Sequence, residues 1–92
     1  MLTLQTTKQY RKDRNLCKKR GLEMGLLDDV ILTLLEQKPL APKHRDHALT
    51  GNYAGFRECH ILPDWLLMYK VDKGKLILTA SRTGTHSDLL KL

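Results

Sequence analysis

Residues 55–82, GFRECHILPDWLLMYKVDKGKLILTASR, decide the fold that this sequence predicts. Three runs in this stretch are rich in apolar, β-branched or aromatic residues, at positions 55–62, 65–71 and 75–82. The breaks between them are short, with Pro-Asp at 63–64 and Asp-Lys-Gly at 72–74, and both favour turns. Because strands joined by tight turns pair as hairpins, we expect three consecutive antiparallel strands.

The first half of the chain predicts one short strand and two helices. Residues 2–5 alternate with the period of a strand, and Thr6 or Thr7 can then cap a helix over residues 7–20. Leucine, valine and isoleucine recur at helical spacing over residues 26–35, so this segment predicts a second helix with one wide apolar face. Two acids at 28 and 29 are expected in its first turn, and Pro39 ends it.

The order of strand, helix, helix and three strands predicts an α+β fold with one domain over residues 1–92. We expect a two-helix hairpin packed on one face of a small, mainly antiparallel, four-stranded sheet. Residues 39–52 are expected to be a loop. The second face of the sheet is then free to form a shallow binding groove, because a chain of this size buries too little surface for a deep cavity.

The composition restricts the partners that this chain can have. Sixteen Lys and Arg against ten Asp and Glu give a net charge of +6, which favours a polyanionic or acidic partner. No apolar run is long enough to span a membrane, and we expect no membrane partner. Cys17 and Cys59 form no CxxC pair, so the simplest prediction is two free thiols in a reducing cytoplasm.

Three histidines are the main candidates for catalytic residues. His47, His60 and His86 lie in the β-rich half, and imidazole is the side chain that titrates nearest neutrality. Cleavage of RNA by its own 2′-hydroxyl needs a base, an acid for the leaving 5′-oxygen and cations for the transition state. Arg57 and Arg82 supply guanidinium groups that fit phosphate oxygens. This set predicts a metal-independent ribonuclease with no cofactor.

Two acids and three aromatic residues could complete such a site. Glu58 and Asp64 could act as a base or orient an imidazole. An unpaired base could stack on Trp65, Tyr53 or Tyr69.

Each of these interpretations has a structural alternative. Trp65 could pack in the core, and Arg57 and Arg82 could form ion pairs with Glu58 or Asp88. A histidine in the Lys-His-Arg loop at 43–45 is expected to be solvated. Strand parity also places Arg82 on the face of Leu78 and Ala80, toward the core, unless a bulge re-aims it.

A metal site and a nucleic-acid contact are two further possibilities. A zinc site from the three histidines and Asp64 is disfavoured because they lack local spacing such as HxxxH. The basic run at 8–20 is more often a solvated helix face than a specific RNA contact.

The motifs that carry these residues resemble a known family. The stretches DHALTG at 46–51, FRECHILPDW at 56–65 and RTGTHS at 82–87 closely resemble YafQ-type toxins of the RelE/ParE superfamily of bacterial type II toxin–antitoxin systems. This likeness implies a ribonuclease-like toxin with helices on one face of an antiparallel sheet. It also implies cleavage of mRNA in the ribosomal A site and neutralisation by a cognate antitoxin.

The resemblance also assigns roles to residues. His47, His60, Asp64 and His86 match the family's active-site positions. His86 is the expected general acid, and His60 or His47 is preferred over Glu58 as the base. Arg82 matches a residue that faces the scissile phosphate, and Trp65 lies beside the site. The family often has an aromatic residue where this chain has Leu90.

Two other functions remain as alternatives. A ParE-like toxin that binds DNA gyrase without catalysis needs no histidine set, so the crowded imidazoles argue against it. A plain nucleic-acid-binding module would use the basic helix, would bind with a steep salt dependence and would not arrest growth.

Overall fold

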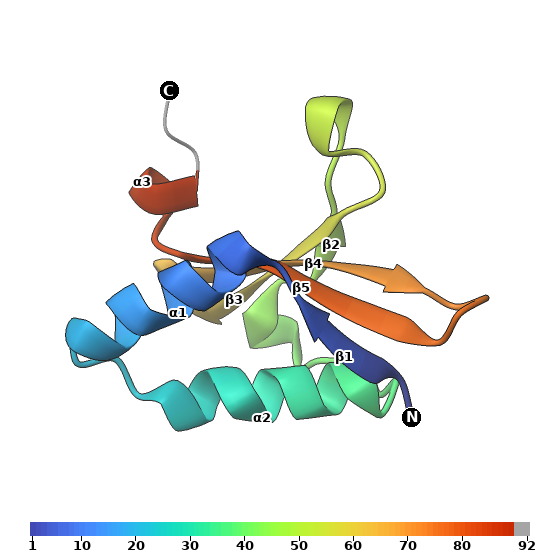
Figure 1. Cartoon of the computed structure of the whole chain (residues 1–92), viewed down its shortest axis with the longest axis horizontal. Helices are drawn as coiled ribbons and strands as arrows, with labels where there is room; N and C mark the ends of the chain where they lie inside the picture. The colour runs from blue at the N-terminus through green and yellow to red at the C-terminus, as the bar shows by residue number, and fades with distance from the viewer. Residues whose placement is uncertain (90–92) are drawn as a thin grey trace.

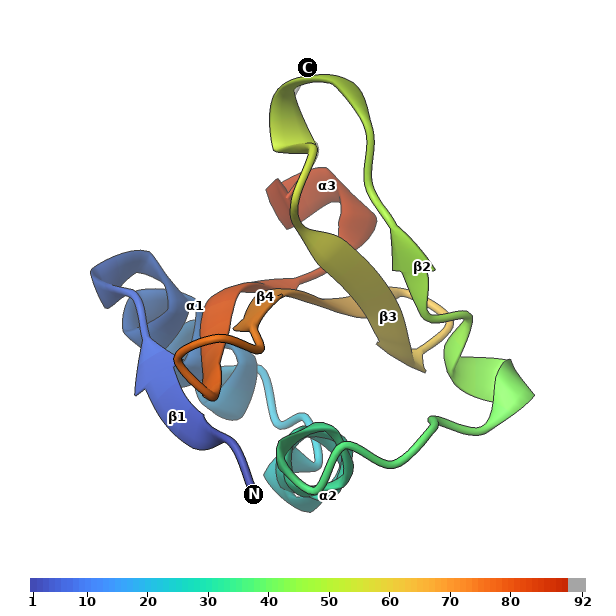
Figure 2. The same cartoon turned by 90° about the vertical axis from the view of Figure 1, so that its right-hand side faces the viewer.

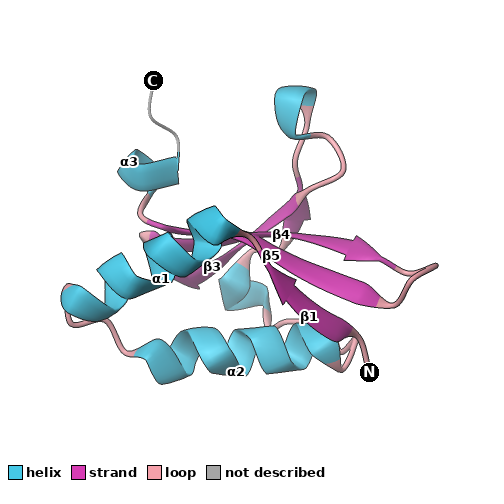
Figure 3. Cartoon of the chain, viewed as in Figure 1, coloured by secondary structure: helices cyan, strands magenta, loops and turns pink. Residues whose placement is uncertain are grey.

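A computed structural model describes residues 1–89 of the chain (Figure 1). The helices and strands follow one another as β1 Thr3–Thr6, α1 Lys8–Lys19, α2 Met24–Leu35, β2 His47–Ala48, β3 Arg57–Leu62, β4 Trp65–Asp72, β5 Ile77–Gly84 and α3 His86–Leu89 (Figure 3). Two short 3-10 turns, η1 Pro42–His44 and η2 Gly51–Tyr53, flank β2. Within the described residues, no helix is long and apolar enough to cross a membrane.

The sheet has the strand order β1-β5-β4-β3-β2. The pairs β2–β3, β3–β4 and β4–β5 are antiparallel, as the three-strand prediction requires, whereas β1 runs parallel to β5. The α+β class is confirmed, but the sheet is mixed and has five strands instead of four. The additional strand, β2, forms inside the segment that was expected to be only a loop, where two residues pair with β3.

The two long helices pack against the sheet and form the core with it. Figure 2 shows α2 beneath the sheet, while α3 and the segment between β2 and β3 rise on the other side. The core contains buried side chains from both helices and from the strand positions that face them: Leu2, Tyr10, Cys17, Leu27, Val30, Ile31, Leu34, Cys59, Ile61, Trp65, Leu67, Tyr69, Leu78 and Ala80. The opposite face therefore remains available for a site.

The observed start of α1 agrees with the sequence prediction, and the observed start of α2 does not. Thr7 is the N-cap of α1, and its Oγ1 accepts a hydrogen bond of 2.9 Å from the backbone N–H of Tyr10. The prediction for α2 began too late, because the helix starts at Met24 with Glu23 as its N-cap. Asp28 and Asp29 therefore lie beyond the first turn, where their interaction with the helix dipole is weaker.

A bulge in β5 settles the direction of Arg82. Tyr69 pairs with Ala80, but the preceding residue Met68 pairs with Arg82, so Ser81 is an extra residue in β5. Such a bulge changes which face the following side chains occupy. Arg82 consequently lies on the face opposite Ala80, away from the core, and simple alternation along the strand gives the wrong answer.

Candidate active site

A row of four side chains crosses the sheet on the face that the helices leave open. In the backbone register His47 is opposite Glu58, Glu58 is opposite Met68, and Met68 is opposite Arg82. Directly opposed residues project from the same face of a sheet, so all four share one surface. We call this surface the open face.

A second row brings His60 onto the same surface. His60 is opposite Leu66, and Leu66 is opposite Gly84 at the end of β5. His86 follows two residues after Gly84, at the start of α3. The rings of His60 and His86 consequently lie side by side, with centroids 5.6 Å apart and planes inclined at 53°.

Asp64 holds His86 in place. Its Oδ1 accepts hydrogen bonds from the backbone N–H of His86 at 3.0 Å and from Nδ1 of the His86 ring at 2.6 Å. These two hydrogen bonds lower the pKa of Asp64, so the carboxylate stays ionised. Asp64, His86 and His60 form a compact group, which we call the histidine cluster.

The hydrogen-bond partners of the rings define which nitrogen is free. A backbone carbonyl or carboxylate oxygen only accepts, so the nitrogen that faces it must donate. His60 directs Nδ1 at the carbonyl of Pro63, 3.2 Å away, and His86 directs Nδ1 at Asp64. In both residues Nε2 is therefore the atom available to a ligand.

His47 lies on the open face but outside the histidine cluster. Its Nδ1 donates to the carbonyl of Arg45 at 2.7 Å, and its Nε2 lies 3.7 Å from Oε1 of Glu58, a carboxylate that is only 7% exposed. Three strand spacings separate His47 from Arg82, or about 14 Å. The structure therefore does not bring these two predicted site residues together.

Arg82 is anchored to α1. Oδ2 of the buried Asp13 accepts from its Nε at 2.9 Å, and Oδ1 accepts from its Nη2 at 3.2 Å. The same carboxylate also accepts from the backbone N–H of Thr83 at 3.2 Å. The hydrogen bonds to Asp13 raise the pKa of Arg82 further, so the guanidinium is a fixed charge on the edge of the open face.

Arg57 does not belong to this surface. It is opposite Tyr69 and therefore lies on the face of the sheet that carries the core. Its Nε and Nη2 each lie 3.3 Å from a carboxylate oxygen of Asp46, which also accepts from the hydroxyl of Tyr69. The geometry thus corrects the expectation that Arg57 joins His60 and Arg82 at one phosphate, and supports the ion-pair alternative with a different acid.

Trp65 is a core residue and not a stacking platform. Its side chain is 2% exposed, and Nε1 donates to Oγ1 of Thr83 at 3.0 Å. Tyr69 is equally buried, whereas Tyr53 on the segment between β2 and β3 is 45% exposed. Of the three aromatic residues predicted to stack on a base, Tyr53 alone offers its ring to a ligand.

The sequence interpretation missed several acids that position the site. Asp13 is 69 residues from Arg82 along the chain, and no local pattern marks it. Asp46 lies 11 residues before Arg57 in the DHALTG stretch, but that stretch does not show that the two side chains pair. Asp88 did have a signal, since Thr85 and Asp88 form a capping box: each backbone N–H donates to the other's side chain, at 2.9 and 3.1 Å. The guanidinium of Arg20, 2.7 Å away, helps to hold the pKa of Asp88 well below its ordinary value.

Another missed contact involves the loop histidine. His44 was expected to be solvated, but it is half-buried, and its Nδ1 donates to the carbonyl of His60 at 2.6 Å. The η1 turn is thereby attached to the strand that carries His60. Leu90, the departure from the family pattern, lies outside the described residues. Across residues 1–89 no group of three or more His, Cys, Asp or Glu side chains is arranged to hold a metal ion.

Comparison with known proteins shows the family of this chain. Residues 2–91 match the family described as "Bacterial toxin of type II toxin-antitoxin system, YafQ". The chain belongs to the YafQ toxin family. A curated YafQ relative, the "mRNA interferase toxin YafQ" of Escherichia coli K12, is 41% identical over 83 residues, which cover 88% of this chain and 87% of the relative.

Solved structures show the same YafQ fold. A metal-bound toxin from Helicobacter pylori superposes with a TM-score of 0.92 at 44% identity and covers 97% of this chain and 99% of its own. The toxin-like chain in the Escherichia coli DinJ–YafQ complex gives a TM-score of 0.88 at 33% identity, with 97% and 98% covered. This YafQ-family chain is therefore a toxin of a type II toxin–antitoxin system, with its histidine cluster on the open face.

Proposed function

We propose that this toxin is an endoribonuclease that cuts translated mRNA in the ribosomal A site by attack of the 2′-hydroxyl. The observation that carries the proposal is the histidine cluster. Two imidazoles lie 5.6 Å apart, both with Nε2 free, and a carboxylate fixes one of them. Each ring can form a hydrogen bond of about 2.6–3.2 Å, so both rings can contact a single scissile phosphate that lies between them. The name of the curated relative, an mRNA interferase, supports cleavage of mRNA as the activity.

The proposed reaction needs one base and one acid. Nε2 of His60 accepts the proton of the 2′-hydroxyl, and the 2′-oxygen then bonds to phosphorus. The bond from phosphorus to the 5′-oxygen breaks, and His86, which acts as an imidazolium with a proton on both ring nitrogens, gives its Nε2 proton to that oxygen and keeps its Nδ1 proton on the side of Asp64. The products are a cyclic 2′,3′-phosphate and a free 5′-hydroxyl. His60 is preferred to His47 as the base because His47 presents its Nε2 to Glu58.

Asp64, Arg82 and Tyr53 have supporting roles in this proposal. Asp64 accepts a hydrogen bond from Nδ1–H of His86, which fixes the ring so that Nε2 faces the RNA. Arg82 contributes a fixed positive charge for the phosphate oxygens. Tyr53 is 45% exposed, so its ring can stack on a base. Glu58 holds His47 in position through the contact between its Oε1 and Nε2 of the His47 ring.

The ribosome completes the site in this proposal. The histidine cluster has few catalytic groups, and such a catalyst depends on a partner that presents the RNA in a reactive conformation. The expected partners are accordingly the bacterial ribosome and its mRNA, and a cognate antitoxin that neutralises the toxin, as in the Escherichia coli DinJ–YafQ complex. This activity belongs in the cytoplasm and uses protons rather than a metal ion.

Expression without antitoxin tests the proposal. The wild type and the variants His60→Ala and His86→Ala are induced in bacteria, and cuts in a defined transcript are mapped by primer extension. We expect growth arrest with in-frame cuts that disappear in both variants, since a proton-transfer group contributes about 10²–10⁴-fold. His44→Asn is the matched control, because it removes a histidine outside the cluster and keeps a donor for the carbonyl of His60.

Different outcomes would reject different parts of the proposal. Arrest without cuts, accompanied by gyrase–DNA adducts, would favour the gyrase-binding alternative. Cleavage of mRNA that has a 2′-deoxy substitution at the scissile nucleotide would rule out attack by the 2′-hydroxyl. Metal independence predicts that protein dialysed against EDTA still cuts mRNA on purified ribosomes.

A further inference from the structure

The solvent side of α1 is a strongly basic surface that the histidine cluster does not use. On this 12-residue helix the buried residues are Tyr10, Asp13 and Cys17. With 100° between successive residues, the exposed side opposite them is lined by five cations, which we call the α1 basic face: Lys8, Arg11, Lys12, Lys18 and Lys19.

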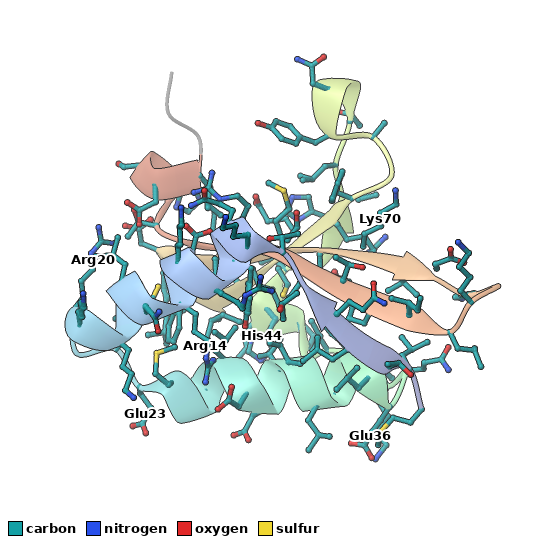
Figure 4. All side chains as sticks on the ribbon, viewed as in Figure 1. Arg14, Arg20, Glu23, Glu36, His44 and Lys70 are labelled. Carbon is teal, nitrogen blue, oxygen red and sulfur yellow. The ribbon has the colours of Figure 1, made fainter. Side chains whose placement is uncertain are left out.

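These charges are not balanced by neighbouring acids. Arg14 pairs with Asp28 at 3.0 Å and Arg20 pairs with Asp88 at 2.7 Å; both arginines are labelled in Figure 4. Among residues 1–89, by contrast, no ion pair within 4.0 Å involves a member of the α1 basic face. The helix also places Lys8 and Lys12 four residues apart, a spacing at which like charges repel. The face therefore has uncompensated charge to offer to an anion.

The shape of the face favours the backbone of a nucleic-acid duplex. Lys8, Lys12 and Lys19 form a line along the helix axis that is about 16 Å long at 1.5 Å per residue. A duplex presents one negative charge per roughly 1.7 Å of its axis, so several phosphates can meet this line. The aromatic residue of α1, Tyr10, is buried, and the face has no ring on which single-stranded bases could stack.

We propose that the α1 basic face binds the backbone phosphates of double-helical RNA, as a contact separate from the histidine cluster. The choice of RNA rests on the proposed function, in which the partner is a ribosome rich in RNA duplexes. Contacts to phosphates position a protein without reading sequence. Because the α1 basic face lies opposite the buried Asp13, which binds Arg82, RNA on this face would leave the open face accessible to the strand that is cut.

Binding of a labelled RNA hairpin tests the proposal. Fluorescence anisotropy of a fluorescein-labelled 16-base-pair hairpin is measured from 50 to 200 mM KCl with full-length protein carrying His86→Ala, which is expected to remove cleavage. The test variant adds K8Q, K12Q and K19Q. The matched control adds K43Q, K73Q and K75Q, three exposed lysines elsewhere, and so has the same net charge. Circular dichroism confirms that both are folded.

In the test variant the slope of log K against log[KCl], which is negative, is expected to become less steep by about 2–3, because each lost phosphate contact contributes roughly 0.9 to its magnitude. Its affinity at 100 mM KCl should fall at least tenfold, whereas the control should lose less than threefold. Co-sedimentation with purified ribosomes should show the same ranking. Equal losses in the two triple variants would overturn the proposal, as would tighter binding of a DNA duplex of the same sequence. Because these proteins carry His86→Ala, the result is independent of whether the histidine cluster cuts mRNA.

Discussion

Replacing Thr83 by valine separates a structural role of Trp65 from a role in binding RNA. Thr83 is 1% exposed, and its hydroxyl accepts from Nε1 of Trp65 at 3.0 Å while donating to the carbonyl of Leu66 at 2.7 Å. Valine has nearly the same shape without the hydroxyl, so the variant leaves the indole N–H buried without a partner. An unsatisfied buried group costs about 1–3 kcal/mol.

This cost is large enough to measure in a protein of this size. At the midpoint of that range, about 2 kcal/mol, the melting temperature should fall by roughly 8–16 °C. The assay is thermal and urea unfolding, both followed by circular dichroism, for the wild type, Thr83→Val, Trp65→Phe and the double variant. The double variant should lose less than the sum of the single losses, because it removes the donor and the acceptor together.

Thr83→Ser is the control, since serine keeps the hydroxyl and should lose less than about 1.5 kcal/mol. At a temperature where each protein is folded, Thr83→Val should cut ribosome-bound mRNA at a rate close to that of the wild type. A stability loss below about 0.5 kcal/mol for Thr83→Val, or strictly additive losses, would refute the hydrogen bond as a source of stability. If Thr83→Val had normal stability but no cleavage activity, Trp65 would have a role in binding RNA.

Three further predictions concern Asp64, Gly84 and Cys59. Because the hydrogen bonds from His86 lower the pKa of Asp64 below its ordinary value of about 3.9, their contribution to stability is complete above about pH 4 and is lost as the pH falls through the lower, folded-state pKa. The difference in urea midpoint between wild type and Asp64→Asn should therefore shrink at acid pH, and a constant difference would contradict this linkage. A Cβ at Gly84 would lie 2.8 Å from Oδ2 of Asp88 at a backbone φ of +156°, so Gly84→Ala should cost about 1–3 kcal/mol in urea unfolding and reduce cleavage by displacing the start of α3; unchanged cleavage would show that His86 tolerates this shift. Burial raises the pKa of Cys59 to about 12, so a thiol reagent at pH 8 should modify it only at the rate of unfolding, and rapid labelling of the native protein would contradict its burial.

Local sequence patterns predicted the parts of this fold that depend on neighbouring residues. The three strands of the second half, their two tight turns and the cap at Thr7 all follow from spacing and turn chemistry, which act over a few residues. The proximity of Asp64 to His86 was suggested by motif resemblance, and the geometry agrees with it. The two-residue strand β2 was missed because its only support is pairing with β3.

Contacts between distant segments were beyond the reach of sequence patterns. The bulge at Ser81 reversed the face of Arg82, and a bulge depends on how β5 pairs with β4. Arg82 binds Asp13, which is 69 residues away. Arg57 binds Asp46 on the core side of the sheet, opposite the open face. Neither acid was identified, because nothing local to an aspartate shows which arginine the folded chain brings to it.

The sequence by itself determined that the chain forms an α+β fold, that its charge is strongly positive and that the imidazoles needed for proton transfer lie in the β-rich half. These properties depend on residue type and on short-range periodicity. Only the tertiary structure decided that His60, His86 and Asp64 meet on the open face, while His47 lies apart, Arg57 faces the core side and Trp65 is buried. The reason is physical: which face a strand residue occupies depends on the register with its neighbours, and register is fixed by burying the whole core at once.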